Sequence, residues 1–408
     1  MEKYSRFNDP SNLVNPFAPL SHYPPAALRY LTGPVLLLLR APFLLFAVLL
    51  LTVASGVAGV AASCGRPGRP LERLLRRALE APLARFLLLV LGYWSVPASY
   101  AAANKLRLRR IAGNAKNDAG SVRAGTRPMP VGSCVHAGDI VVSTATSPVE
   151  VLWCTWAFAP RFATVVDTTT TPSDDASQDT AGVQIHGMWG ALQVFASLQP
   201  VPRTSTNNSI GAITTTLRQA ADAGTGFAGY PTVVFPEGVR SNGTGVLMFH
   251  PVFDDLDFDD NRVHLLAFTH RNHPSSKFSA TLPVGSAFKS LLWHCMHWSH
   301  TMRVTMLPAA ELVAPPAKES DAAIKARKDA QVKKEIAARA NKGAYGGGIE
   351  PTVPMPDPGV LGTRCRNLLA KMLGVEALTR CSKDFVPFLE FWRNEEAGRK
   401  KNMKARLD

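Results

Sequence analysis

Paired cysteines are missing from this chain. Its six cysteines are scattered and no two form a Cys-x-x-Cys pair, so neither a structural zinc site nor a disulfide framework is expected. Isolated thiols are typical of proteins that work in a reducing compartment. RNA-recognition, zinc-finger and helix-turn-helix patterns are also missing, which excludes the common classes of nucleic-acid-binding protein.

Acidic residues are scarce relative to basic ones. The chain has 45 Lys and Arg against 31 Asp and Glu in 408 residues, a formal net charge of +14. A basic protein favours an acidic partner, either nucleic acid or an anionic membrane surface. The densest arginines flank two apolar segments, so we expect the partner to be the anionic membrane surface, with no nucleic acid bound.

The two apolar segments predict a membrane-anchoring region over residues 31–110, after an N-terminal arm at 1–30. Residues 41–63 are 23 positions without a charge, enough for a bilayer at about 20 residues per span. Residues 86–103 are 18 such positions, interrupted by Gly92 and Pro97. Basic residues flank both segments, which conflicts with two crossings. A re-entrant hairpin is slightly favoured over two spans, and a buried core helix stays open.

The rest of the chain is organised around an α/β domain at 131–315, where apolar β-branched runs alternate with helical patterns. We predict a charged helix at 316–342, a Gly/Pro linker at 343–359 and a basic helical tail at 360–408. The predicted strands are 139–143, 162–166, 231–235, 263–269 and 302–307. The predicted helices are 148–158, 187–198, 210–223 and 286–299.

One loop carries the strongest chemical signal. The residues Phe235-Pro-Glu-Gly-Val-Arg-Ser241 follow an apolar strand and present a carboxylate, a glycine and a guanidinium. Glycine lets a backbone approach a ligand closely, and a guanidinium matches the geometry of phosphate. The pattern predicts binding of an anionic substrate.

A second loop, Thr144-Ala-Thr-Ser-Pro-Val-Glu150, follows the strand that ends at Ser143. Ser147 suits an N-cap, Pro148 the first helical position, and Glu150 the third, which together would form a capping box. The local pattern therefore has a purely structural interpretation beside a functional one. The histidine-rich stretch 294–300 has no neighbouring carboxylate, so no metal site is expected there.

Together the two loops resemble the PlsC-like glycerolipid acyltransferase family, the 1-acylglycerol-3-phosphate acyltransferases. Within that family, the Met-Glu-Lys-Tyr-Ser start of the chain, the Thr146-Ser-Pro148 core of the second loop and the long basic tail resemble the fungal lysophosphatidic acid:oleoyl-CoA acyltransferase group. The family pairs Asn-His-x-Ser-x-x-Asp with Phe-Pro-Glu-Gly-Thr-Arg-Ser. Here Val239 replaces the threonine, Glu150 the aspartate and Ala145 the histidine. The resemblance implies a mixed sheet flanked by helices, with N-terminal membrane-anchoring helices and a C-terminal helical tail.

The resemblance also implies roles for individual residues. Substrate binding would fall to Glu237, Gly238, Arg240 and Ser241, and places in the reaction centre to Ser147 and Glu150. In the family a histidine deprotonates the acceptor hydroxyl, and Ala145 cannot. Three replacements for that base follow from the sequence: Glu150 itself, His136 or His250.

The implied activity is that of a membrane-bound acyl-CoA:lysophospholipid acyltransferase, most simply one that acylates lysophosphatidic acid to phosphatidic acid. Acyl-CoA would be a co-substrate, and no bound cofactor or metal is expected. The alternative is a non-catalytic relative that binds lysophospholipid or acyl-CoA in lipid organisation or trafficking. The expected location is the endoplasmic reticulum membrane, lipid droplets or both, with the active domain facing the cytosol.

Overall fold

The structure is a computed structural model of the chain. The residues that it describes are 2–20, 31–63, 68–101, 127–129, 135–166, 182–196, 214–223, 225, 229–256, 262–271, 280–281, 283–285, 287–313 and 359–404.

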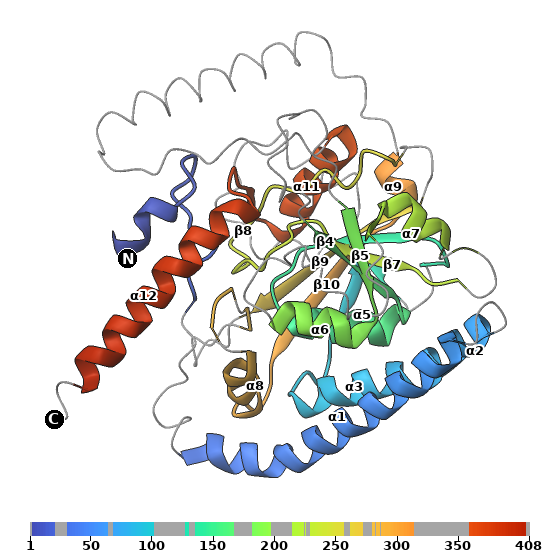
Figure 1. The fold of residues 1–408 in the computed structure, drawn as a ribbon, viewed down its shortest axis with the longest axis horizontal. Helices are drawn as coiled ribbons and strands as arrows, with labels where there is room; N and C mark the ends of the chain where they lie inside the picture. The colour runs from blue at the N-terminus through green and yellow to red at the C-terminus, as the bar shows by residue number, and fades with distance from the viewer. Residues whose placement is uncertain are drawn as a thin grey trace, which may run out of the picture.

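A nine-stranded mixed sheet forms the centre of the molecule (Figure 1). The strand order is β2-β1-β10-β9-β3-β7-β4-β5-β6, and its four middle strands, β9, β3, β7 and β4, are mutually parallel. The mixed α/β class predicted from the sequence is therefore confirmed. The strand bounds in this order are Arg127–Pro128, Ala98–Tyr100, Thr301–Leu307, Val263–Arg271, Ile140–Ser143, Thr232–Phe235, Arg161–Val166, Gly182–His186 and Thr214–Thr215.

The sheet is covered on both faces, which explains why its central strands are apolar without interruption. On one face, Val141 and Val233 pack with α3, α5, α6 and α8. On the other, Val142 and Val234 pack with α7, α9 and α11. The helix bounds are α3 Ala81–Val90, α5 Pro148–Phe158, α6 Met188–Ala196, α7 Leu217–Ala223, α8 Ala287–Cys295, α9 Ala309–Val313 and α11 Gly359–Leu373.

The predicted elements of this domain agree with the structure apart from two helices, one of which, expected at 286–299, ends at Cys295. All five predicted strands are present, and α5 has the predicted bounds. The helix expected at 210–223 begins only at Leu217, because Thr214–Thr215 forms β6 and pairs with β5. The charged helix at 316–342, and all of the linker at 343–359 except Gly359, lie outside the described residues.

The N-terminal apolar segment forms one long helix, α1 (Gly33–Ser63), along the lower edge of the molecule in Figure 1. Its Gly33–Ala61 portion is long and apolar enough to cross a membrane by length and composition. It packs along its length on α2 (Gly68–Leu75), η3 (Arg76–Glu80) and α3. The inward stripe consists of Arg40, Ala47, Leu51, Ala54, Ala58 and Ala61.

The second apolar segment does not form a membrane helix, which corrects the prediction for 86–103. Its first part belongs to α3, which ends at Val90, and Ala98–Tyr100 form β1 alongside β10. Gly92 makes the turn between them with a φ of +93°, a conformation that side chains rarely adopt. Within this run Leu87, Leu88, Leu91 and Tyr93 are buried in the domain.

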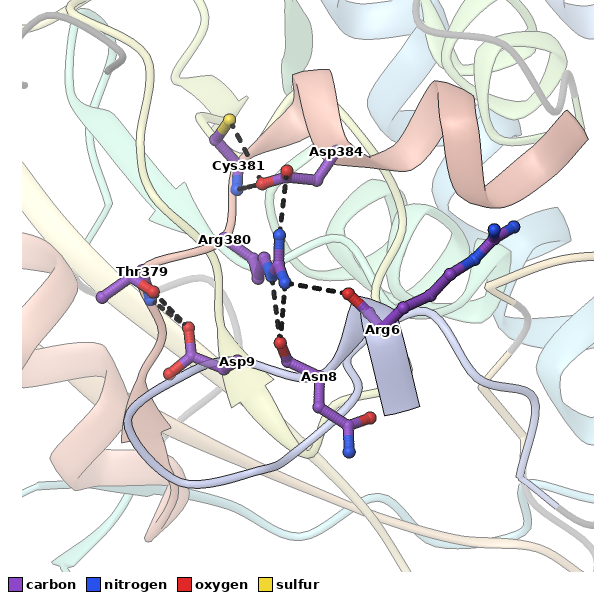
Figure 2. Close-up of polar contacts among 7 residues, drawn as sticks. All are labelled: Arg6, Asn8, Asp9, Thr379, Arg380, Cys381 and Asp384. Carbon is purple, nitrogen blue, oxygen red and sulfur yellow. Dashed lines mark hydrogen bonds and ion pairs between the residues drawn. The ribbon is translucent and has the colours of Figure 1, made fainter. Parts of the chain in front are cut away.

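The two ends of the chain pack together. The N-terminal helix η1 (Glu2–Phe7) contributes Phe7 to an aromatic cluster with α12 (Phe385–Lys404), where the two rings of Phe7 and Phe388 lie 5.0 Å apart. Figure 2 shows Arg380 donating hydrogen bonds to the backbone oxygens of Asn8 and Arg6, at 2.8 and 3.2 Å. Beside them Asp9 accepts from the Thr379 backbone N–H at 2.7 Å. The tail is helical as predicted, and it docks on the domain and on the arm.

Candidate functional site

The two loops singled out in the sequence meet at the carboxyl edge of the parallel strands. One loop follows β3 and the other follows β7, and these strands are neighbours. The Ser241 backbone N–H donates to the Ala145 oxygen at 3.0 Å. Parallel α/β sheets bind ligands outside this edge of their strands. The structure thus brings the predicted site residues into one region.

Glu237 joins the two loops through its side chain. Its carboxylate accepts from the Ala145 N–H at 3.3 Å and from the Leu247 N–H at 2.9 Å. The side chain is fully buried, and this burial raises its pKa to about 7, although the two backbone hydrogen bonds act in the opposite direction. Both oxygens are therefore engaged in holding the site together.

Gly238 is required by close packing. Its φ is +67°, and a Cβ at this position would lie 2.7 Å from the Nε2 of His250. That imidazole nitrogen in turn lies 2.9 Å from the Oγ of Ser382, in η6 (Ser382–Asp384). The glycine thus lets His250 pack beneath the loop, where it fixes the backbone ahead of Arg240.

Arg240 has a buried guanidinium whose two terminal nitrogens have no hydrogen-bond partner among the residues that the structure describes. The residue is only 5% exposed, and its Nη1 and Nη2 atoms make no hydrogen bond within the described residues. Burial lowers the pKa of Arg240 to about 10, so the group remains charged at neutral pH. Burying a positive charge costs free energy unless an anion pairs with it. The neighbouring Ser241 hydroxyl is likewise buried and has no hydrogen-bond partner in this part of the chain.

The other loop opens α5 much as the sequence predicts. Ser147 is the N-cap, and its side chain accepts from the Val149 N–H at 3.4 Å. The predicted capping box does not form, however. The Glu150 carboxylate accepts from the N–H of Thr146 at 3.1 Å, and also from its hydroxyl, instead of from the N–H of Ser147.

The sequence-based prediction missed His270, which is the closest ionisable partner of Glu150. Its Nε2 lies 3.0 Å from Glu150 Oε1, and its side chain is 4% exposed. The Nδ1 atom is buried and makes no hydrogen bond within the described residues. His270 stands on β9 beyond the end of β3, on the sheet face that carries Phe268. The predicted strand ended at Thr269, two residues before the observed end at Arg271, and so left out His270.

The two histidines considered from the sequence contact other residues. His136 has a side chain that is 80% exposed and lies 3.7 Å from Asp139, at the amino edge of the parallel strands. His250 packs under Gly238 and binds Ser382.

Tyr93 is a second residue of the site that the sequence-based prediction missed. It is fully buried, and its hydroxyl has no hydrogen-bond partner among the described residues. Burial and the charge of Glu150 both raise its pKa, and its ring stacks on His300 at 5.1 Å. Tyr93 lies in the apolar run 86–103, where an aromatic residue is indistinguishable from a membrane-facing one.

The described residues contain no cluster of three or more His, Cys, Asp or Glu side chains arranged to hold a metal ion. The chemistry that they offer is a buried cation for an anion, and an imidazole paired with a carboxylate in the adjoining loop. Comparisons with protein-family models, with curated proteins and with solved structures give no match to this chain.

Proposed function

We propose that the protein is a membrane-bound acyl-CoA:lysophospholipid acyltransferase that acylates lysophosphatidic acid to phosphatidic acid. The observation that carries the proposal is the buried guanidinium of Arg240, which has no protein anion within the described residues. A phosphate monoester supplies the missing negative charge and matches the fork of the guanidinium. Ser241, whose buried hydroxyl has no hydrogen-bond partner in the described part of the chain, is a second donor for the same phosphate.

The remaining residues of the loop position this anion site. Glu237 ties the loop to the Ala145 and Leu247 amides, and Gly238 permits its tight turn over His250. The Glu150 side chain lies in the neighbouring loop, which Ser241 contacts through Ala145. A lysophospholipid held by its phosphate would therefore extend its glycerol toward the start of α5.

The apolar surface of α1 supports membrane attachment. Its outward face carries large exposed hydrophobic residues, among them Leu38, Leu45 and Leu49. Next to the inward-facing Arg40, two exposed tryptophans, Trp94 and Trp298, have ring centroids 6.4 Å apart. Exposed aliphatic side chains with neighbouring tryptophans are typical of surfaces that enter the bilayer interface. The substrates would reach the site from that surface.

The test is an assay of the purified full-length protein with labelled oleoyl-CoA and a panel of lysophospholipids, in liposomes. We expect transfer to lysophosphatidic acid. Replacing Arg240 by Met should raise the KM for the acceptor about 10- to 150-fold, because a hydrogen bond to a charged group contributes about 1.5–3 kcal/mol. Arg262→Met is the matched control, since Arg262 pairs with Asp222 far from the loop.

The same variant has a second expected effect on stability. Removing a buried, unpaired charge should leave the free energy of unfolding unchanged or raise it, by up to about 4 kcal/mol. If no acceptor in the panel receives an acyl group, the proposed acyltransferase activity is refuted. Binding of lysophosphatidic acid that depends on Arg240, without any transfer, would favour a non-catalytic lipid-binding protein instead.

A further inference from the structure

We infer that His270 is the general base of this site and takes the place of the histidine that Ala145 replaces. The inference rests on the proposed acyl transfer. It assigns the proton acceptor to strand β9 instead of to the loop after β3. The juxtaposition that leads to it is the contact between His270 Nε2 and Glu150 Oε1 at 3.0 Å.

The contact has the arrangement that a general base needs. A carboxylate bound to one imidazole nitrogen fixes the orientation of the ring and leaves the other nitrogen to accept a proton. Glu150 is itself held by the N–H and the hydroxyl of Thr146. Its position is therefore set by the same loop that contacts the Arg240 loop through Ala145 and Ser241.

The free nitrogen distinguishes this pair from a structural one. His270 Nδ1 is buried and has no hydrogen-bond partner among the described residues. His264, six residues earlier on β9, also binds a carboxylate, with Nε2 3.2 Å from Asp139. Its Nδ1, however, accepts the Ala309 N–H at 3.3 Å. Only His270 of the two has a nitrogen left for substrate.

In the proposed step, Nδ1 of His270 accepts the proton of the glycerol hydroxyl as that oxygen bonds to the thioester carbonyl carbon. Collapse of the tetrahedral intermediate breaks the carbon–sulfur bond, and the electron pair leaves on sulfur. The imidazolium then returns the proton to the thiolate. The products are the ester and free coenzyme A, and His270 and Glu150 are restored. Glu150 positions the ring and stabilises its protonated form.

The experiment compares His270→Gln and His270→Ala with the wild-type protein in the same labelled oleoyl-CoA assay. The glutamine keeps a donor for Glu150 but cannot take a proton, so its stability should stay close to that of the wild type. We expect kcat to fall about 10²- to 10⁴-fold in both variants with little change in KM. Added imidazole should restore part of the activity of His270→Ala, which a purely structural role would not allow.

His264→Gln is the control, because it removes an imidazole from the same strand outside the site. Its kcat should stay near the wild-type value. An active wild type whose His270→Gln variant keeps its rate within about threefold would overturn the role of His270 and leave the acyltransferase proposal intact. A wild type inactive on every acceptor would instead overturn the proposed function, and this inference with it.

Discussion

Strand β9 carries a buried histidine–carboxylate pair near each end, and the two differ in one hydrogen bond. At the amino edge of the parallel strands, His264 binds Asp139 and also accepts the Ala309 N–H. At the carboxyl edge, His270 binds Glu150, and its second nitrogen has no partner within the described residues. The fully satisfied pair fastens α9 to the sheet. The other lies where parallel α/β sheets bind ligands.

The difference shows that residue type and burial do not by themselves identify a functional histidine. Both side chains are less than a tenth exposed, and both lie within hydrogen-bonding distance of a carboxylate oxygen. What separates them is whether the protein uses the second nitrogen. A buried polar atom left without a partner is costly, so it is retained where a ligand completes it.

The largest expected effect comes from replacing the carboxylate of the His270–Glu150 pair at the carboxyl edge. Glu150→Gln should lower kcat about 10²- to 10⁴-fold, because the ring loses its orientation and its charge partner. The double variant with His270→Gln should have a kcat only slightly lower than that of either single variant, since the two residues act as one unit. Single-turnover rates of the wild type, the two single variants and the double variant measure these losses in kcat. If the rate loss of the double variant equals the product of the two single losses, the residues act separately.

The next effect concerns Glu237, a second buried carboxylate at the carboxyl edge, which binds backbone amides instead of an imidazole. Its pKa is raised from 4.5 to about 7, so its contribution to stability is present below pH 4.5 and is lost as the pH rises through about 7. At about 1.4 kcal/mol per pKa unit, this loss is on the order of 3 kcal/mol.

Urea unfolding of the wild type and of Glu237→Gln between pH 4.5 and 8 measures that loss. The difference between the two unfolding free energies should change across this range, because the uncharged glutamine does not titrate. Parallel curves for the two proteins would contradict the raised pKa of Glu237.

The smallest effect is expected at the amino edge. His264→Ala removes the acceptor of the buried Ala309 N–H and a partner of Asp139, which should lower the free energy of unfolding by about 1–3 kcal/mol. Because both nitrogens of His264 serve the fold, kcat of the folded protein should not change. If fully folded His264→Ala had a lower kcat than the wild type, His264 would also contribute to catalysis, and the two ends of β9 would not differ in function as described.

Local sequence patterns predicted the elements that position the site. Ser147 and Pro148 mark the start of α5, and its observed bounds match the prediction because capping is a contact between near neighbours. The run 86–103 was misinterpreted because apolar composition is the same for a membrane helix and for a buried turn and strand. Gly92 and Tyr93 instead pack against the loop before β10, where Gly92 approaches Trp298 and Tyr93 stacks on His300.

The sequence by itself determined the α/β class and the two loops that carry the candidate site residues, because strand periodicity and helix caps are local. It also showed that the expected base is missing at Ala145. Only the tertiary structure decided that His270, 120 residues from Glu150, stands beside it. That pairing depends on β9 extending past its neighbour β3 in the sheet, and strand register between distant segments is set by packing.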